Sequence, residues 1–552
     1  MKKVTFKKYD QGQIQLFPPR LDERIGENHP VRLINSIVDD LDLTDLIKQY
    51  QAGGTSPYNP RMLLKVVFYA YMNNVYSCRK IAKCLDENIH YMWLSGGQYP
   101  SFSTINRFRS ERLKNQINQL FTQVVFMLVD LGQISLDVSY IDGTKIESVA
   151  NKYTFVWRKS VEKNKAKLEA KIRFILEQID QGIAQDKDNG EQDQAPAIDS
   201  QELKERIKKL NESNTFDKKV NKAEFKALKE LEKHQEKLEE YEQKLDMLGD
   251  RNSYSKTDTD ATFMRMKEDA MNNGQTKPGY NIQIGTENQY ITNFGIYSNP
   301  TDTTTLNSFI TLHYARFGSL PKVICADSGY GSHENYKFLE QNNIQAFVKF
   351  PYFHKEQKRS YKQNGFLVDN LFYNSEDDFY ICPIGQRLSK VDKKRTTSST
   401  GFISNIDIYK AENCQGCPLR GRCHKSKDNR IIQVNHDLLA YKAKVREILT
   451  SEQGLYHRSK RPIEPEAVFG QMKFNKQYKR FRHKGSSKVQ MDFALFAMAF
   501  NIQKLWKNMA TNLKKVCFAL YLPIFTLIKS FEFKNIHKRI GKEQNRVKLD
   551  FV

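Results

Sequence analysis

One stretch decides the fold: SYIDGTK, residues 139–145. It follows residues 134–138 (ISLDV), a short apolar-rich segment that predicts a buried strand. Asp142 then falls near the end of that strand, and an ionised carboxylate in such a place needs a metal ion or a base as its partner. Gly143 directly after it allows the backbone to turn or a ligand to approach. Alone, this Asp-Gly pair fits an exposed hairpin turn better, so the case for chemistry depends on two later acids.

A second acid, Asp327, repeats the pattern. Residues 323–330 (VICADSGY) predict an apolar strand that ends at Asp327 and turns at the serine and glycine after it. The surrounding segments predict the rest of a sheet and its helices: strands at 280–285, 290–297 and 344–350, and helices at 303–317 and 334–341. Strand, hairpin, helix, strand, helix, strand is the order of a ribonuclease H-like core. Ligands of α/β sheets bind at the carboxyl ends of the strands, where both aspartates are expected.

A third acid follows in residues 456–473 (YHRSKRPIEPEAVFGQMK). Pro465 suits a first helical turn, so we expect a helix to start there, with Glu466 near its start and Glu464 outside it. Lys473 lies two helical turns after Glu466 and therefore on the same face. A glutamate that can bind a metal ion and a lysine that can hold a phosphate then face the same way. Taken alone, Glu466 also fits an acid that favours the N-terminal end of the helix dipole.

The densest basic patch of the chain surrounds this third acid. Lysines and arginines are interleaved here with Phe474, Tyr478 and Phe481, a mixture that suits a nucleic-acid backbone. The basic side chains of this patch that we expect on DNA are Arg458, Arg461, Lys476, Arg480, Arg482 and Lys484. An apolar helix predicted at 492–505 is expected to pack behind the sheet.

The first 130 residues predict helices. Apolar side chains recur at helical spacing, and Pro60 suits the first turn of a mostly buried helix. Further on, Ser101 or Ser103 could cap a short helix that presents Arg107 and Arg109. A helix, a turn and a helix bearing arginine and asparagine form a groove-reading unit, so we expect this region to read DNA. A plain helical bundle is the alternative.

Two insertions interrupt the predicted sheet. In the first, residues 159–250, the chain is rich in Lys, Glu, Leu and Gln, and Leu231, Leu238 and Leu245 repeat every seven residues. This pattern predicts a coiled-coil-like helical hairpin that projects from the fold. It would serve either as a solvated spacer or as a dimerisation arm or a clamp on DNA.

The second insertion, residues 351–455, bears cysteines. Their number and one CxxC pair match a structural Zn²⁺ site, in which His424 could replace a cysteine. The candidate ligands are Cys382, Cys414, Cys417 and Cys423. The gap after the first of them is long, and reduced thiols without a metal are the alternative.

The composition limits the class of protein. With 87 Lys and Arg against 64 Asp and Glu, the net charge is +23, which calls for a polyanion or an anionic surface as partner. Nucleic acid is favoured over a membrane, because no signal peptide is visible and no apolar run is long enough to cross a bilayer. Eight cysteines in 552 residues are too few for a disulfide framework and suggest a reducing compartment.

Taken together, these motifs resemble those of the DDE-type insertion-sequence transposases of bacteria. The resembling stretches are IDGTKIE (141–147) with residues 153–158 after it, YNIQ (280–283), ADSGY (326–330) and EAVFGQMK (466–473). The helical N-terminal region and the cysteines at 414–423 are similar to one subgroup of that family. The resemblance covers most of residues 5–505, and the order of the motifs makes it specific.

The resemblance implies a ribonuclease H-like catalytic domain in which Asp142, Asp327 and Glu466 hold two Mg²⁺ ions, or Mn²⁺ in their place. Lys473 and the arginines would position phosphates. The family often has a tyrosine and an arginine before the glutamate. Tyr456 and Arg461 or Arg458 stand near that place, at a spacing that departs from the strictest form.

We therefore expect a DNA transposase that binds the terminal inverted repeats of its element, frees 3′-OH ends by two-metal catalysis and joins them to target DNA. A homodimer or larger homo-oligomer on double-stranded DNA is the expected form, in the bacterial cytoplasm at the nucleoid. Two alternatives stay open: a catalytically inactive DNA-binding regulator derived from a transposase, and a metal-dependent nuclease without strand transfer.

The expected fold class is α/β, a mixed sheet flanked by helices, with an all-α N-terminal domain and the two insertions. The predicted domains are a helical DNA-binding domain (1–131), the core (132–158, 251–350 and, with its catalytic helix, 456–510), the charged helical hairpin (159–250), the cysteine-bearing insertion (351–455) and a basic tail (511–552).

Overall fold

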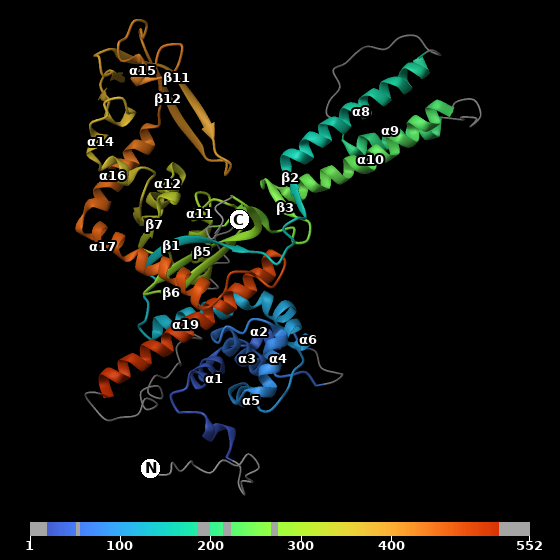
Figure 1. Ribbon diagram of the computed structural model, residues 1–552, viewed down its shortest axis with the longest axis vertical. Helices are drawn as coiled ribbons and strands as arrows, with labels where there is room; N and C mark the ends of the chain where they lie inside the picture. The colour runs from blue at the N-terminus through green and yellow to red at the C-terminus, as the bar shows by residue number, and fades with distance from the viewer. Residues whose placement is uncertain (1–18, 51–55, 185–198, 214–221, 267–273, 518–552) are drawn as a thin grey trace, which may run out of the picture.

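The computed structural model describes residues 19–50, 56–184, 199–213, 222–266 and 274–517. A mixed sheet lies at the centre, with helices packed around it. Two long helices project to one side, and a smaller sheet lies away from the centre on the other (Figure 1). Of the predicted basic tail, residues 518–552 lie outside the described part of the chain.

Within the described residues, the central sheet has the order β4-β5-β1-β7-β8, and β6 also pairs with β5. Strand β1 is antiparallel to β5, whereas β7 and β8 run parallel to it. The strands are β1 (Val138–Glu147), β4 (Thr262–Arg265), β5 (Thr276–Glu287), β6 (Tyr290–Tyr297), β7 (Val323–Ala326) and β8 (Gln345–Val348). The paired strands predicted at 280–285 and 290–297 are thus confirmed, as is the strand before Asp327.

Strand β1 continues past the predicted turn. Residues 140–147 all pair with β5, so Asp142 and Gly143 lie inside the strand, opposite Ile284 and Gln283. The prediction that the strand ends near Asp142 is therefore wrong. An antiparallel partner supplies backbone hydrogen bonds along this whole length, and a glycine does not end a strand that is paired in this way.

In the described residues, seven α-helices precede the sheet. They are α1 (Pro30–Asp40), α2 (Thr44–Ile47), α3 (Pro60–Met72), α4 (Cys78–Glu87), α5 (Ile89–Ser95), α6 (Phe102–Arg107) and α7 (Ile117–Asp130), with 3-10 turns at Leu21–Arg24 and Leu113–Asn115 and a π turn at Phe108–Arg112. Pro60 begins α3 as predicted, and the side chain of Asn59 caps it. Ser101 is the residue that caps α6, since its hydroxyl accepts from the Thr104 N–H.

One long helix, α19 (Ser486–Cys517), packs against both the N-terminal helices and the sheet. Phe493 of α19 shares a core with Phe121 of α7 and Phe294 of β6. The predicted apolar helix at 492–505 is therefore present and packs behind the sheet as expected. Because of this shared core, the N-terminal helices and the sheet form one packed body.

A second core cluster lies under α11 (Leu306–Phe317), α12 (His333–Gln341) and α16 (His436–Thr450). Ile141 and Ala326, the residues just before the two aspartates, belong to it and are buried. Both aspartates therefore follow strand residues that are anchored in a close-packed interior.

The first insertion forms the long projecting helices of Figure 1. It consists of α8 (Arg158–Ala184), α9 (Ser200–Ser213) and α10 (Lys222–Leu248), and a strand pair at its base, β2 (Phe155–Trp157) with β3 (Ser253–Ser255), brings its two ends together. Leu231 and Leu238, predicted as seam residues, are buried against Leu168 and Ile172 of α8. The predicted helical hairpin is present.

The second insertion contains the smaller sheet, which is antiparallel and has the order β13-β12-β11-β10-β9. Its strands are β9 (Phe372–Asn374), β10 (Phe379–Ile381), β11 (Arg387–Thr397), β12 (Ile403–Ala411) and β13 (Ile431–Val434). The insertion also contains three short helices, α13 (Phe353–Glu356), α14 (Arg359–Lys362) and α15 (Arg420–Cys423), and a 3-10 turn at Val368–Asn370. Helix α16 then leads the chain back to the core, where it packs on β8.

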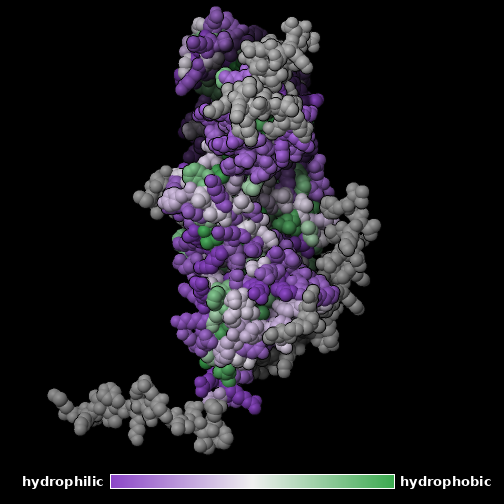
Figure 2. Space-filling view, turned by 90° about the vertical axis from the view of Figure 1, so that its right-hand side faces the viewer, coloured by the Kyte–Doolittle hydropathy of each residue, from purple (hydrophilic) through white to green (hydrophobic). Residues whose placement is uncertain are grey.

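One face of the protein is largely polar (Figure 2). Figure 2 shows a face on which most coloured residues are hydrophilic and the hydrophobic ones are scattered. Within the described residues, none of the helices is both long and apolar enough to span a bilayer.

Candidate active site

Two aspartates stand side by side because of the strand register. Strands β1 and β7 are parallel, and their last paired residues are Ile141 and Ala326. The next residue on each strand is an aspartate, Asp142 on β1 and Asp327 after β7. Neighbouring strands lie about 4.8 Å apart, so the register alone brings these two carboxylates close together.

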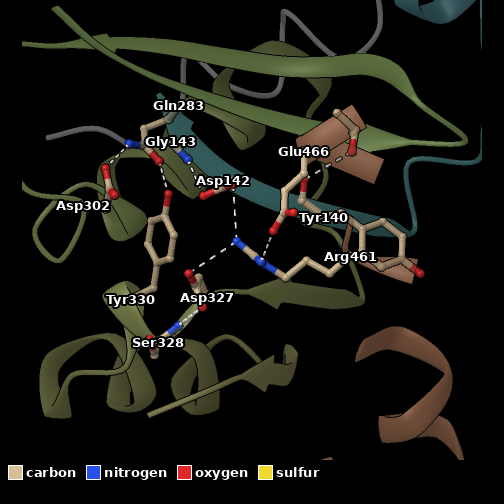
Figure 3. A network of polar contacts seen from close by, with 11 residues as sticks. Tyr140, Asp142, Gly143, Gln283, Asp302, Asp327, Ser328, Tyr330, Arg461 and Glu466 are labelled. Carbon is tan, nitrogen blue, oxygen red and sulfur yellow. Dashed lines mark hydrogen bonds and ion pairs between the residues drawn. The ribbon is translucent and has the colours of Figure 1, made fainter. Parts of the chain in front are cut away.

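Each aspartate has one oxygen held by the backbone. Oδ1 of Asp142 accepts from the Gly143 N–H at 2.9 Å, and Oδ1 of Asp327 accepts from the Ser328 N–H at 2.7 Å. In both cases the other oxygen, Oδ2, faces the guanidinium of Arg461. The local backbone therefore orients both carboxylates toward one point (Figure 3).

The third acid lies in a helix that starts earlier than predicted. Helix α17 (Glu452–Lys460) continues through a π turn (Pro462–Glu466) into α18 (Ala467–Gly470) and a second π turn (Gln471–Asn475), with helical dihedrals at the junctions. The prediction that Pro465 begins the helix is wrong. Prolines remove N–H donors and crowd an α-helix, and the wider π turn, common at functional sites, accommodates them.

Glu464 and Glu466 face different partners. The buried Glu464 accepts from the Gln289 N–H at 2.7 Å, and its burial raises the pKa of this carboxyl. Oε1 of Glu466 lies 2.7 Å from Nη1 of Arg461. Of the two glutamates that the sequence offered, Glu466 is thus the one that shares a cation with Asp142 and Asp327.

Arg461 lies at the centre of the three acids. Its Nη2 is 3.3 Å from Oδ2 of Asp142 and 3.5 Å from Oδ2 of Asp327, and its Nη1 holds Glu466 (Figure 3). Burial works to lower the pKa of the guanidinium, but the Asp142, Asp327 and Glu466 carboxylates raise it above its usual value. Three carboxylates thus share one guanidinium, with the charge of Lys349 also acting on Asp327 and Arg461.

The donor chemistry of this cluster suits a hard divalent cation. Carboxylate oxygens are the ligands that Mg²⁺ prefers, usually one or two of them together with waters and phosphates. Among the described residues, which include these acids and the four candidate cysteines, no group of three or more His, Cys, Asp or Glu side chains is arranged to hold a metal ion. The three carboxylates fit Mg²⁺ by type and number, and Arg461 stands between them.

The predicted DNA-contacting side chains divide into two groups. Arg107, Arg480, Arg482 and Lys484 are exposed. Lys476 is buried, its ammonium donates to the Met72 carbonyl, and burial lowers its pKa to about 8. Arg458 is half-buried over the Phe353 ring and donates to the Leu449 carbonyl. Lys473 is also buried, in the π turn after Glu466.

Arg109 is held inside the protein. Its guanidinium donates to the Tyr71 hydroxyl at 2.7 Å, the Tyr76 carbonyl at 3.0 Å and the Cys78 sulfur at 2.8 Å. The expectation that Arg109 reads DNA therefore does not agree with its placement. Nothing in its local sequence reveals this, because its partners lie about 30 residues away or more.

Arg109 belongs to a second buried cluster, around Asp492 of α19. Tyr71 and Tyr478 donate their hydroxyls to this carboxylate, and His483 lies 3.7 Å from it. Burial works to raise the pKa of Asp492, but His483, Arg109 and Tyr71 outweigh it and lower the pKa to about 2. This cluster ties α3 to a helix more than 400 residues later in the chain.

The cysteines of the second insertion share one region. Cys382 and Cys414 pack against the core of the smaller sheet. Arg430 lies between two of the thiols: its backbone N–H donates to the Cys414 sulfur at 3.3 Å, and its Nη1 lies 3.2 Å from the Cys423 sulfur. Zinc binding by Cys382, Cys414, Cys417 and Cys423 stays a prediction.

The sequence interpretation missed a polar network beside the acids. Asp302 accepts hydrogen bonds from Asn281 and Gln283, and Gln283 in turn accepts one from the Tyr330 hydroxyl (Figure 3). The sequence could have indicated Gln283 and Tyr330, because each is the last residue of a stretch that resembles the transposase family. Asp302 gave no such signal, since Asp beside Thr before a helix fits an ordinary turn.

Two protein-family models match the chain. A family described as Transposase DDE domain matches residues 381–506, which include Arg461, Glu466 and Lys473. A family described as Transposase domain (DUF772) matches residues 19–111, the region of helices α1–α6. Asp142 and Asp327 lie outside both matched ranges. No curated protein matches the chain.

Both matches are to transposase domains, and together they indicate an insertion-sequence DDE transposase, the family that the motifs of the chain resemble.

Proposed function

We propose that this transposase binds the ends of its mobile element, cleaves phosphodiester bonds there and joins the freed 3′-OH ends to target DNA. One observation above all supports the proposal: Asp142, Asp327 and Glu466, far apart in the sequence, converge on a single guanidinium. Three carboxylates around one cation suit Mg²⁺, and such sites serve phosphoryl transfer. The net charge of +23 supplies the attraction to DNA.

The core that holds these acids is, in this proposal, ribonuclease H-like. Its support is the strand order β6-β5-β1-β7-β8, in which β1, β7 and β8 are parallel and β5 is antiparallel to β1, to β6 and to β4. Asp142 and Asp327 follow the last paired residues of two adjacent parallel strands, the side of an α/β sheet where ligands bind.

Asp142, Asp327 and Glu466 would hold two Mg²⁺ ions, or Mn²⁺ in their place. Such ions, when bound, activate the attacking water or 3′-OH and stabilise the leaving oxygen. Arg461 must leave the carboxylates before ions can bind, and its guanidinium can then pair with a DNA phosphate. The backbone N–H bonds to Asp142 and Asp327 keep both carboxylates oriented meanwhile.

The DNA surface in this proposal consists of the exposed basic side chains. Arg107 and Arg482 line one cavity of about 530 Å³, between helices α4 and α6 and the segment after the catalytic helix. Arg480 and Lys484 flank Arg482 and are also exposed. We leave out Arg109 and Lys476, which are bonded inside the protein.

Lys473 stays the candidate for holding a phosphate beside Glu466. A homodimer or larger homo-oligomer would bring the two element ends together, and Zn²⁺ on the four cysteines would brace the second insertion.

Cleavage of a labelled terminal-repeat duplex in Mg²⁺, measured beside binding of the same duplex, tests the proposal. Asp142→Ala, Asp327→Ala and Glu466→Gln should each slow cleavage by more than about 100-fold, because even outer-shell partners of metal ligands cost 10–100-fold. Binding should persist, because it depends on the basic surface. Glu464→Gln is the matched control and should keep most of the activity, since this side chain faces Gln289.

Two results would contradict the site. The first is cleavage by all four variants. The second is an inactive Glu464→Gln protein beside an active Glu466→Gln protein. Products that are cleaved but never joined to a target duplex would leave DNA cleavage standing and remove strand transfer.

A further inference from the structure

We infer that Asp302 is a positioning residue of this active site: with Gln283 and Tyr330 it sets how Asp142 and Asp327 stand relative to each other. The inference rests on the proposed function. It concerns a carboxylate that precedes α11 and lies next to both aspartate-bearing segments (Figure 3).

Asp302 is held from both sides. Its backbone carbonyl accepts from the N–H and the hydroxyl of Thr305, at the start of α11. Its Oδ1 accepts from Nδ2 of Asn281 and from Nε2 of Gln283, each at 2.7 Å. A charged acceptor makes about twice as strong a hydrogen bond as a neutral one, so the helix start and β5 together fix this carboxylate.

The carboxylate and the Gln283 amide occupy the space beside Gly143. A methyl group on Gly143 would come within 2.3 Å of Nε2 of Gln283 and 2.5 Å of Oδ1 of Asp302. A methyl group on Gly329, two residues after Asp327, would lie 3.9 Å from Cβ of Asp302. Glycine follows Asp142 because this network needs the space, and the backbone there is strand, not turn.

Gln283 connects Asp302 by hydrogen bonds to the turn that follows the second aspartate, Asp327. Its Nε2 donates to Asp302, so its Oε1 is left to accept from the hydroxyl of Tyr330. Tyr330 is fully buried and closes the turn that Asp327 caps. Because a carboxylate can only accept, Asp302 holds the Gln283 amide in the orientation in which Oε1 accepts from Tyr330. A bond from the same Nε2 to Oδ1 of Asn281 at 3.1 Å supports this orientation.

The network therefore links the two acids by a route other than the strand pairing. It runs from the residue after Asp142, through Gln283 on the opposite strand, to the turn of Asp327. Asparagine at 302 could turn its own amide toward Gln283 and release that orientation. The two carboxylates would then lose a support that metal binding needs.

Titration of Mn²⁺ into the chelator-washed full-length chain tests the inference. Asp302→Asn should bind Mn²⁺ about 10-fold more weakly than wild type, the lower end of the loss seen when an outer-shell partner of a metal ligand is removed. Its urea unfolding midpoint in EDTA should stay at the wild-type value. The half-saturating Mg²⁺ concentration for cleavage should rise in parallel, while binding to terminal-repeat DNA is unchanged.

Asp137→Asn is the matched control. Asp137 lies just before the other end of β1, where its half-exposed side chain pairs with Lys322, and this change should leave Mn²⁺ affinity unchanged. Tyr330→Phe removes only the last hydroxyl of the network and should weaken Mn²⁺ binding severalfold. If Asp302→Asn does not fold, the Mn²⁺ affinity of Tyr330→Phe tests the inference in its place.

If Asp302→Asn binds Mn²⁺ as tightly as wild type, the inference is wrong and the proposed function still stands. The same holds for Tyr330→Phe if Asp302→Asn does not fold. A wild-type chain that neither binds Mn²⁺ nor cleaves DNA overturns the proposed function and this inference with it.

Discussion

Two buried arginines, Arg109 and Arg461, have opposite surroundings. Arg109 is 2% exposed and donates to a hydroxyl, a carbonyl and a thiol, close to one carboxylate, Asp492, which is itself 1% exposed. Arg461 is 7% exposed, yet it faces three carboxylates, two of which, on Asp327 and Glu466, have side chains nearly half exposed. The first cluster balances one charge with another and excludes water. The second gathers three carboxylates around one guanidinium and is open.

The difference separates a structural cluster from a functional one. A buried charge is tolerated when it is paired and hydrogen-bonded, and the Asp492 cluster meets that condition with its own side chains. The Arg461 cluster instead gathers three carboxylates around one guanidinium, at a place that solvent and ligands can reach. Three acids around one guanidinium suit a site that takes up cations.

The largest expected effect comes from removing the carboxylate of the Asp492 cluster. Asp492→Asn should lower the free energy of unfolding by roughly 3–5 kcal/mol, because it leaves the buried Arg109 without its counter-charge. Urea unfolding followed by tryptophan fluorescence measures this change. Asp327→Asn is the matched control and should cost less than about 1 kcal/mol, since it also relieves repulsion among the acids. Equal losses in both variants would erase the distinction between the clusters.

A slightly smaller effect is expected from Arg461→Ala, and it should depend on the metal. In EDTA the variant should lose roughly 1.5–3 kcal/mol of stability, the range for hydrogen bonds to charged groups, because the three carboxylates then lose the guanidinium that they share. Mg²⁺ should restore more stability to this variant than it adds to wild type. Arg109→Ala, in contrast, should be equally unstable with and without Mg²⁺. A Mg²⁺ response that is the same in both variants would contradict the comparison.

The balanced cluster should also show in the pH dependence of stability. The pKa of Asp492 is lowered from 3.8 to about 2 in the folded protein, so its contribution is fully present above pH 3.8. It is lost as the pH falls from there through 2, and it amounts to about 2 kcal/mol. Unfolding midpoints between pH 5 and 2 measure it. The decline should be shallower in Asp492→Asn; parallel curves for the variant and wild type would contradict the assignment.

The smallest effects concern arginines that belong to neither cluster. Arg480→Ala combined with Arg482→Ala should weaken binding to all duplexes about equally and reduce the slope of log K against log salt by about 2, roughly 0.9 per lost phosphate contact. Arg107→Ala should instead erode the preference for the terminal repeat. Gel-shift titrations at several salt concentrations measure both. Binding that is insensitive to salt would rule these side chains out as the DNA surface.

The positions of the two aspartates could be predicted because each follows an apolar strand that is visible in the local sequence. An apolar strand that runs into an aspartate is visible in one sequence, and two such strands become neighbours if they are parallel. The structure places Ile141 beside Ala326, so Asp142 and Asp327 follow in register. The catalytic roles of these residues stay predictions.

Other features depend on partners distant in the sequence, and there the predictions failed. The basic pattern around Arg109 and Lys476 matches a DNA surface, but the carbonyls and hydroxyls that hold them come from other elements, up to about 400 residues away. The predicted turn after Asp142 is absent, because β1 continues through this position and pairs with β5. Pro465 did not begin a helix because π turns carry the helix through it.

The position of Arg461 and Glu466 on one helical turn affects how the protein is made. Asp327 precedes Arg461 by 134 residues (461 − 327), which a ribosome adds in roughly 7–27 s at about 5–20 residues per second. During that time the nascent chain holds two aspartates without the third acid or the guanidinium. Both then emerge together, five residues apart. A chain whose synthesis stops before this turn has neither the complete acidic site nor the cation that covers it.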